Sequence, residues 1–436
     1  MARIKYLSSR INGYIKWRFF QFSRIIDTYS RRIYFYFPWL ISFVLEIKKS
    51  INRLRMRLFS DSWHEYDFIN ENKPDSIGCI RKIDCIGCGN CILICPKNAL
   101  TLKSDFEGFL YPEISETCTS CKRCLSVCPV VSQENSKGSK FQAYAALGPI
   151  DVRLKSSSGG VFPILASNII ERGGVVIGAA FDDFFHLRHI VATSQDELTR
   201  LFGSKYVQSD LQGIQREILR IVNDGRLVLF AGCPCQVAAV KKFLKAMSDK
   251  VIYLDLLCHG SPSPKIFEKY LNEIRGERII TQISFRDKEV FKWSKNMKIS
   301  FSDGSIYRES EFEDAYLTAF LKSYSLRPHC GYCKYARIPR QGDITVGDFW
   351  EVGKLDESLD DGYGTSLVLI NNEKGHELLM PLTERFAKWQ IVANDVVMKS
   401  TQPYVKPAKY QSRVRREFFE NIKTNTVRES VSLTKK

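Results

Sequence analysis

Hydrophobic side chains in the first 60 residues recur at the spacing of an α-helix. They lie three and four positions apart on one helical face, at Ile4, Leu7, Ile11, Ile15, Phe19, Phe22, Ile26 and Tyr29. Most basic side chains lie off this face, and a second basic helix candidate follows the aromatic stretch 34–39. The apolar stretch 33–45 is shorter than the about 20 residues that cross a bilayer. We interpret residues 1–60 as a basic, aromatic, amphipathic arm lying in a membrane interface. The alternative is a basic helix packed on this protein or on a partner.

Beyond residue 140 the pattern changes to alternating strands and helices. Buried strands are predicted at 174–180, 226–230, 251–257, 343–347 and 366–371, and antiparallel strands within 280–310, with Asp303-Gly304 as a hairpin turn. Helices are predicted at 236–245, after Ser263-Pro264, at 312–324 and at 373–389. We expect the last 30 residues to be weakly structured. This succession predicts a mixed α+β or α/β domain with a partly parallel sheet.

The composition is that of a globular protein, and the charge is unevenly distributed. The chain has 436 residues, 44% of them hydrophobic, and a formal net charge of +16. Residues 1–58 hold 13 Lys and Arg against Asp27 and Glu46, so most of the excess lies there. The remainder is only mildly basic. We therefore expect no nucleic-acid partner.

Eight of the 14 cysteines form a repeat. Each run reads Cys-x2-Cys-x2-Cys-x3-Cys-Pro, and in such runs the fourth cysteine ligates the other of two 4Fe-4S clusters. We assign one cluster to Cys85, Cys88, Cys91 and Cys128, and the other to Cys118, Cys121, Cys124 and Cys95. Zinc is the alternative, but it favours paired Cys-x2-Cys motifs. Residues 78–132 resemble the bacterial two-cluster ferredoxins, and the polar segment 132–140 is a candidate linker.

Five further cysteines lie outside this repeat and Cys79. Cys235 and Cys258 each follow a predicted strand at its carboxyl end, where open α/β sheets bind ligands. Cys330 and Cys333 form a pair with the spacing of metal ligands. These four thiols could hold a third 4Fe-4S cluster and leave Cys233 spare. Alternatively, Cys233 and Cys235 are buried structural thiols, and the pair at 330 and 333 binds zinc or nothing.

Six motifs occur in an order that resembles one family. They are Ser157-Ser158-Gly159-Gly160, Gly203-Ser204-Lys205-Tyr206, Gly232-Cys233-Pro234-Cys235-Gln236, Cys258-His259-Gly260, Cys330-x2-Cys333 and Asp343-Ile344-Thr345-Val346-Gly347-Asp348-Phe349-Trp350. Residues 140–390 thereby resemble the coenzyme F-420 hydrogenase/dehydrogenase beta-subunit family. The resemblance implies FAD and a 4Fe-4S cluster held by Cys235, Cys258, Cys330 and Cys333. Many relatives carry threonine where Cys233 stands.

The same resemblance places FAD near two short motifs. They comprise Ser157, Ser158, Gly159 and Gly160, and Gly203, Ser204, Lys205 and Tyr206. Serines and glycines ahead of a helix offer backbone N–H groups and a positive dipole end to a pyrophosphate. A flexible helix cap is the alternative for the first motif. His259 is a candidate proton donor beside the flavin, although a role in orienting its loop is favoured.

Together these observations predict a flavin- and iron–sulfur-dependent oxidoreductase. It would pass electrons between the ferredoxin-like cluster pair, a third 4Fe-4S cluster and FAD, to reduce or oxidise an organic substrate. A deazaflavin coenzyme or a metabolite of surface-polysaccharide biosynthesis is implied by the family. The alternative is a non-catalytic iron–sulfur electron-transfer subunit of a larger redox complex.

The predicted organisation is an arm (1–60), a two-cluster domain (78–132), a reductase domain (140–390) and a C-terminal tail (391–436). We expect a redox partner protein or ferredoxin, an organic hydride donor or acceptor, and an anionic membrane surface contacted by residues 1–60. The expected location is the cytoplasm, with peripheral attachment at the inner face of the cell membrane.

Overall fold

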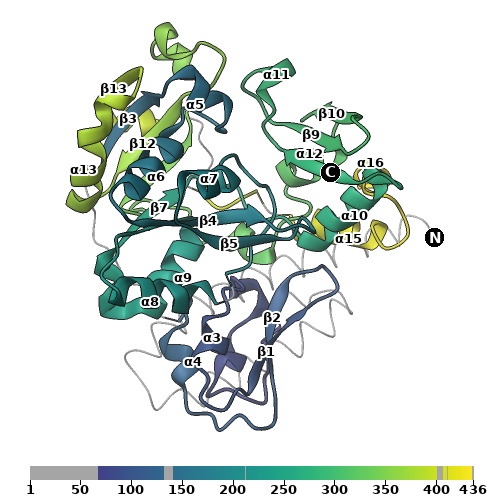
Figure 1. Cartoon of the computed structure of the whole chain (residues 1–436). Coiled ribbons are helices and arrows are strands. Elements are labelled where there is room, and N and C mark those ends of the chain that lie inside the picture. The colour runs from purple at the N-terminus through teal and green to yellow at the C-terminus, as the bar shows by residue number, and fades with distance from the viewer. Residues whose placement is uncertain (1–66, 132–140, 212, 400–405, 410, 435–436) are drawn as a thin grey trace. The chain divides into compact units, whose positions relative to one another are not determined.

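A mixed β-sheet forms the centre of the structure (Figure 1). The structure is a computed structural model and describes residues 67–131, 141–211, 213–399, 406–409 and 411–434. Within these ranges the central sheet has eight strands in the order β13-β3-β12-β11-β7-β6-β4-β5. Their bounds are β3 Gln142–Leu147, β4 Val175–Phe181, β5 Leu187–Ala192, β6 Val228–Gly232, β7 Val251–Leu256, β11 Ile344–Asp348, β12 Ser366–Ile370 and β13 Lys388–Val392. The predicted arm 1–60 and the linker lie outside the described residues.

The middle of the sheet is parallel, as its continuous apolar strands predict. Strands β4, β6, β7 and β11 run parallel to one another, and antiparallel strands flank them on both sides. Because side chains alternate between the two faces of a strand, Leu229 packs on one face and Phe230 on the other. The carboxyl ends of β6 and β7 therefore lie side by side and deliver the residues that follow them to one edge.

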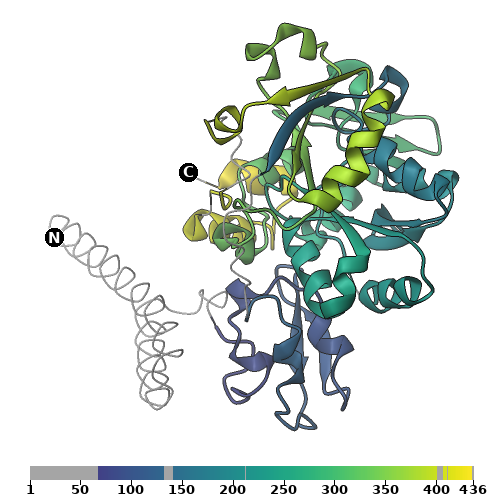
Figure 2. The same ribbon diagram turned by 90° about the vertical axis from the view of Figure 1, so that its left-hand side faces the viewer.

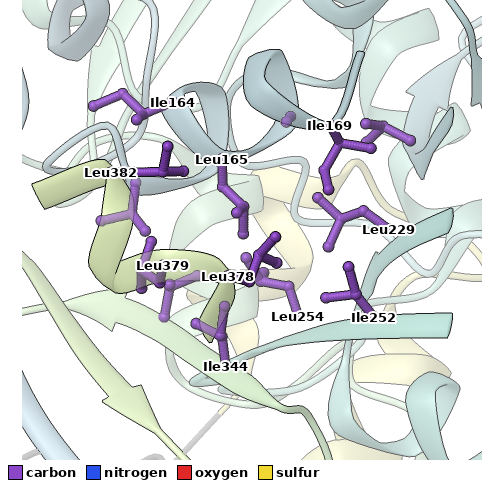
Figure 3. Close-up of a cluster of buried hydrophobic side chains, with 14 of the residues drawn as sticks. Ile164, Leu165, Ile169, Leu229, Ile252, Leu254, Ile344, Leu378, Leu379 and Leu382 are labelled. Atoms are coloured by element: carbon purple, nitrogen blue, oxygen red, sulfur yellow. The ribbon is translucent and has the colours of Figure 1, made fainter. Parts of the chain in front are cut away.

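Helices cover both faces of this sheet. Helices α6 (Val161–Glu171) and α13 (Glu373–Leu379) pack on one face, where Ile164, Leu165, Leu378 and Leu379 meet strand residues such as Leu254 (Figure 3). Helices α8 (Ile214–Asn223) and α9 (Pro234–Leu244) pack on the other face. Short helices α5 (Ile150–Leu154) and α7 (Gln195–Leu198) complete this part of the fold. Burial of both faces accounts for the hydrophobic strand sequences.

A second hydrophobic cluster is built from an antiparallel sheet and four helices. Its strands are β8 Ile280–Ser284, β9 Asn296–Phe301 and β10 Ile306–Ser310, and α11 (Lys288–Phe291) lies between the first two. The helices are α10 Pro264–Arg275, α12 Ala315–Leu321, α15 Ser412–Asn421 and α16 Val427–Leu433. Ser263 caps α10 by accepting from the Ile266 amide, as the Ser-Pro sequence predicts.

The cysteine repeat folds into a small unit of paired turns (Figure 2). Two short helices, α3 (Asn90–Leu93) and α4 (Arg123–Ser126), occupy equivalent places in the two halves. An antiparallel hairpin of β1 (Leu100–Ser104) and β2 (Leu110–Ile114) connects them. Each short helix follows a residue in the left-handed region, Gly89 at φ 75° and Lys122 at φ 62°. The sequence repeat is thus a repeat of backbone conformation.

Two predictions of secondary structure were wrong. The expected helix 373–389 ends at Leu379, a 3₁₀ segment (Met380–Arg385) follows, and Trp389 lies in strand β13. Pro381 cannot continue a helix, and β3 offers β13 a partner at the edge of the sheet. The last residues were expected to be weakly structured, yet Val414, Phe418, Phe419 and Val427 are buried in the second cluster. Helix α14 (Asn394–Lys399) precedes them.

None of the helices in the described ranges is long and apolar enough to span a membrane.

Candidate functional site

Four cysteines of the repeat converge at the first proposed cluster site. Burial raises the pKa of the Cys91 thiol well above its usual value, and the charges of Cys88, Cys85 and Cys128 raise it further. Burial, together with the charge of Cys85, raises the pKa of Cys128 to about 12. Thiols influence one another in this way only at short range. Cys91 and Cys128 also belong to one buried cluster, so the fourth cysteine of the second run lies near the first run.

The other four cysteines of the repeat surround a small cavity of about 20 Å³. Cys95, Cys118, Cys121 and Cys124 line it, with Pro96 and Leu100 among the other lining residues. Backbone N–H groups already point at these sulfurs, since the Ala99 amide donates to Cys95 Sγ and the Ile77 amide to Cys124 Sγ, both at 3.3 Å. This donor set of four thiols with N–H groups aimed at sulfur has the chemistry of an iron–sulfur cluster site.

A third set of thiols assembles from distant parts of the chain. Cys235 lies in the first turn of α9, Cys258 follows β7, and Cys330 and Cys333 come from the loop after α12. Burial raises the pKa of Cys235, and the charges of Cys333, Cys258 and Cys330 add to the rise. The structure thus brings together the four residues that the family resemblance implied.

Cys233 lies beside this third set. Its Sγ is 3.7 Å from the Sγ of Cys258, and its side chain and that of Gln236 form the capping box of α9. Both Cys233 and Cys258 line the candidate cofactor cavity described below. Cys233 is therefore a fifth thiol at the edge of a four-thiol site.

The three sets are arranged in series. Cys124 of the second set contributes to the pKa of Cys91 in the first, and Cys88 of the first contributes to the pKa of Cys235 in the third. A cavity of about 20 Å³ between the first and third sets is lined by Cys88, Cys235 and Cys330. In the described residues no three His, Cys, Asp or Glu side chains converge on a single metal ion. In a 4Fe-4S cluster each of the four thiolates binds a different iron atom, so the ligands of a cluster need not converge on one point.

Hydrogen bonds with residues beyond 140 hold the loop of the first cysteine run in place. Buried Arg327 donates to the carbonyls of Cys85 and Leu110, at 2.8 and 2.9 Å. Gln215 donates to the carbonyl of Cys88, and Asn90 donates to that of Ala239. These bonds fix the distance between the first and third sets of thiols.

Gly87→Ala is expected to destabilise this junction. Gly87 has φ 71°, and a Cβ there would lie 2.8 Å from Nη1 of Arg327. We expect a loss of about 1–3 kcal/mol from backbone strain and a further loss of about 1–3 kcal/mol from overpacking against the guanidinium. Gly173→Ala is the matched control, because Gly173 has φ 76° and nothing within 4 Å. Equal losses in urea unfolding of the two variants would contradict the contact.

A cavity of about 280 Å³ opens at the carboxyl ends of the central strands. It is lined by seven of the eight residues predicted to bind FAD: Ser157, Ser158, Gly160, Gly203, Ser204, Lys205 and Tyr206. The two motifs touch, since the Ser204 amide donates to Ser157 Oγ at 2.5 Å. Its position at the sheet edge, beside the third set of thiols, makes it the candidate cofactor cavity.

Gly159 is the one of these eight residues that is not among those lining the cavity. Its amide donates to Ser366 Oγ at 2.9 Å, and a Cβ would lie 2.1 Å from the carbonyl oxygen of Ala146. The glycine is needed for close packing against strands β3 and β12. The start of α6 offers backbone amides to a ligand instead. The first hydrogen bond of this helix runs from the Ile164 amide to the Gly160 carbonyl, so the amides of Val161 and Phe162 have no partner within the helix.

A half-buried lysine and a buried histidine give the cavity its electrostatic character. The Lys205 ammonium donates to the carbonyls of Phe202 and Gly203, and burial lowers its pKa to about 7. His189 is 7% exposed, and burial lowers its pKa to about 4. Its Nε2 donates to the Ala231 carbonyl, while Nδ1 has no hydrogen-bond partner among the described residues. An anion near Lys205 and an N–H group near His189 would complete these interactions.

Sequence reasoning missed the residues that hold the predicted motifs in place. Arg286 donates to the Ser157 carbonyl, to Tyr206 Oη and to both oxygens of Asp348. Buried Lys288 donates to the carbonyls of Arg153, Ser158 and Tyr363. Neither residue lies in a recognisable motif, because its role depends on contacts with segments far along the chain.

His259 lines the cavity but is held by its neighbours. Its Nε2 donates to the carbonyl of Phe320 at 3.2 Å and lies 3.3 Å from Ser323 Oγ. Burial lowers its pKa, and its ring packs edge-on against Phe320. These contacts connect the loop after β7 to α12, which agrees with the loop-orienting role favoured from the sequence.

Comparisons with known families match two parts of the chain. Residues 84–131 match the family described as 4Fe-4S dicluster domain. Residues 225–387 match the family described as the C terminus of the coenzyme F420 hydrogenase/dehydrogenase beta subunit. Both parts of the resemblance seen in the sequence motifs are therefore confirmed.

Individual proteins are similar to parts of this chain. It is 22% identical over 284 residues to one of the subunits of the F(420)H(2) dehydrogenase of Methanosarcina mazei, covering 60% of this chain and 75% of that protein. It is 44% identical over 45 residues to an uncharacterized ferredoxin of Methanocaldococcus jannaschii, covering 10% of this chain and 58% of the ferredoxin. A chain of the F420-reducing [NiFe] hydrogenase complex from Methanosarcina barkeri aligns with a TM-score of 0.45 and 17% identity, over 68% of this chain and 98% of that one.

Proposed function

We propose that this chain, which joins a 4Fe-4S dicluster domain to a coenzyme F420 hydrogenase/dehydrogenase beta-subunit domain, is a flavin- and iron–sulfur-dependent oxidoreductase. One observation carries the proposal: three sets of four thiols lie in series and end at the cavity of about 280 Å³. Bound clusters supply one-electron transfer, and FAD supplies exchange of one or two electrons with an organic substrate. The protein's own part is to hold these groups at fixed distances and exclude water from them.

The residues around the cavity suit a dinucleotide. The amides of Val161 and Phe162 at the start of α6, with Ser204 and Lys205, would bind the pyrophosphate. The unpaired Nδ1 of His189 would accept a hydrogen bond from an N–H of the flavin ring. Tyr206 stacks on Phe320 at 4.7 Å and would present an apolar wall rather than a free ring face.

A cofactor inventory after anaerobic purification tests the proposal. We expect about twelve iron atoms and one FAD per chain, from three four-thiol sites. Iron near eight atoms would remove the third site, and zinc in place of iron would overturn the scheme. Clusters without flavin would favour a non-catalytic electron-transfer subunit, a role that the naming of the relative from M. mazei as part of a dehydrogenase also suits.

The deazaflavin in that relative's name is the first substrate to try, ahead of a surface-polysaccharide-related metabolite.

Flavin binding should depend on pH through Lys205. The pKa of this lysine is lowered to about 7, and a bound pyrophosphate would raise it, so binding takes up a proton above pH 7. Affinity for FAD should therefore be highest below pH 7 and fall above it by up to about tenfold per pH unit. Calorimetry on flavin-free chain measures this. Lys205→Arg, which stays charged, should bind FAD without that dependence; an unchanged pH profile would contradict the role of Lys205.

The basic arm is proposed to attach the protein to an anionic membrane. Residues 1–58 carry 13 Lys and Arg, and each basic residue near such a surface contributes about 1 kcal/mol. The full chain should sediment with anionic liposomes and be released by high salt. A chain starting at Asp61 should stay in the supernatant with its cofactors. Identical partitioning of the two would instead make the arm a docking segment for a partner protein.

A further inference from the structure

Arg340 is a buried cation with unpaired N–H groups. Its side chain has 0% exposure, and so has that of Asp255, whose Oδ2 lies 3.4 Å from Nη2 of Arg340. The same Nη2 donates to the Leu256 carbonyl at 2.7 Å. The other two guanidinium nitrogens, Nε and Nη1, are buried and have no hydrogen-bond partner among the residues that the structure describes. Leaving buried donors unpaired is unfavourable, so they imply an acceptor.

The surroundings of Arg340 identify that acceptor. Leu256 ends β7 two residues before Cys258, and Cys333 lies on the same loop as Arg340. The hydrogen bond to the Leu256 carbonyl therefore holds the guanidinium at the end of β7, next to the segment that carries Cys258, while its own loop carries Cys333.

We propose that Arg340 donates its free N–H groups to sulfur atoms of the third 4Fe-4S cluster and raises the reduction potential of that cluster. This inference rests on the proposed function, since it requires the cluster at the third set of thiols. Reduction adds negative charge to a cluster, and both a nearby cation and N–H···S hydrogen bonds favour the reduced form. Asp255 acts in the opposite direction, because its carboxylate partly neutralises the guanidinium. The pair thus sets the potential of the cluster next to the candidate flavin cavity.

Redox titration of the full chain, followed by electron paramagnetic resonance, tests the proposal. The signal of the third cluster is identified as the one absent from Cys258→Ser. Arg340→Met should shift its potential to more negative values and remove an exchangeable-proton coupling from its pulsed spectrum, with the other two clusters unchanged. Arg340→Lys, which keeps the charge, should restore part of the shift. Asp255→Asn should shift the potential to more positive values.

The matched control is Arg153→Met. Arg153 is also buried and pairs with Asp361, but its described contacts include no cysteine, so the three potentials should not change. An unchanged potential in Arg340→Met, or shifts of the same sign in Arg340→Met and Asp255→Asn, would overturn the inference. If Arg340→Met loses iron, the potentials of Arg340→Lys and Asp255→Asn test the inference in its place. Loss of iron in all three variants would show that the pair has a purely structural role and would overturn the inference. Iron near eight in the unaltered chain would refute the proposed function itself, and this inference with it.

Discussion

Cys258→Ser is expected to lose about four of about twelve iron atoms and to leave the spectra of the two ferredoxin-type clusters intact. Cys258 lies in the third set of thiols, and the two ferredoxin-type sets are assigned eight other cysteines, all within residues 85–128. Electron transfer from the ferredoxin-like part to the flavin should fall to background, because the third set lies between the two. Iron analysis and stopped-flow reduction of the flavin by a pre-reduced ferredoxin measure both effects.

Cys233→Ser is the matched control for this experiment. The two sulfurs are 3.7 Å apart and both line the large cavity, yet only Cys258 is assigned as a ligand. The control should therefore keep all its iron. If Cys233→Ser loses the cluster and Cys258→Ser keeps it, the ligand assignment is reversed. Loss of all iron from Cys258→Ser would contradict the independence of the third site.

Glu107→Gln is expected to lower the free energy of unfolding by about 3–5 kcal/mol. Glu107, in the β1–β2 turn, forms a two-pronged ion pair with Arg415 of α15, with side-chain exposures of 8% and 3%. The substitution leaves the arginine charge buried with part of its compensation removed. Guanidinium unfolding of anaerobically purified chain measures the loss.

Removing both partners of this pair provides the control. Glu107→Gln combined with Arg415→Met leaves no buried charge, so the double variant should recover much of the stability lost in the single one. A double variant as unstable as the sum of the two single ones would contradict this explanation. The pair joins α15 to the cysteine-rich part of the chain.

The sequence determined the features that depend on neighbours along the chain. The two cysteine runs predicted eight ligands, because thiolates two residues apart converge on one cluster within a single turn. Short runs of apolar residues predicted β6, β7, β11 and β12 to within two residues. The Ser263-Pro264 sequence predicted the start of α10, since capping is a local interaction.

Only the tertiary structure decided the features that depend on distant segments. Trp389 lies in a strand because β3 pairs with it, and the C-terminal helices form because they bury Phe418 and Phe419 in a cluster built elsewhere. Arg286, Lys288 and Arg340 carry no motif, since a buried cation is defined by the carbonyls and carboxylates around it. The third set of thiols depended on both kinds of information. The cysteine spacing suggested which residues are ligands, but the four thiols come together only because the strand order places β6, β7 and the loop after α12 next to one another. The sequence therefore determines short-range chemistry, whereas a site shared by three distant segments exists only after the sheet has formed.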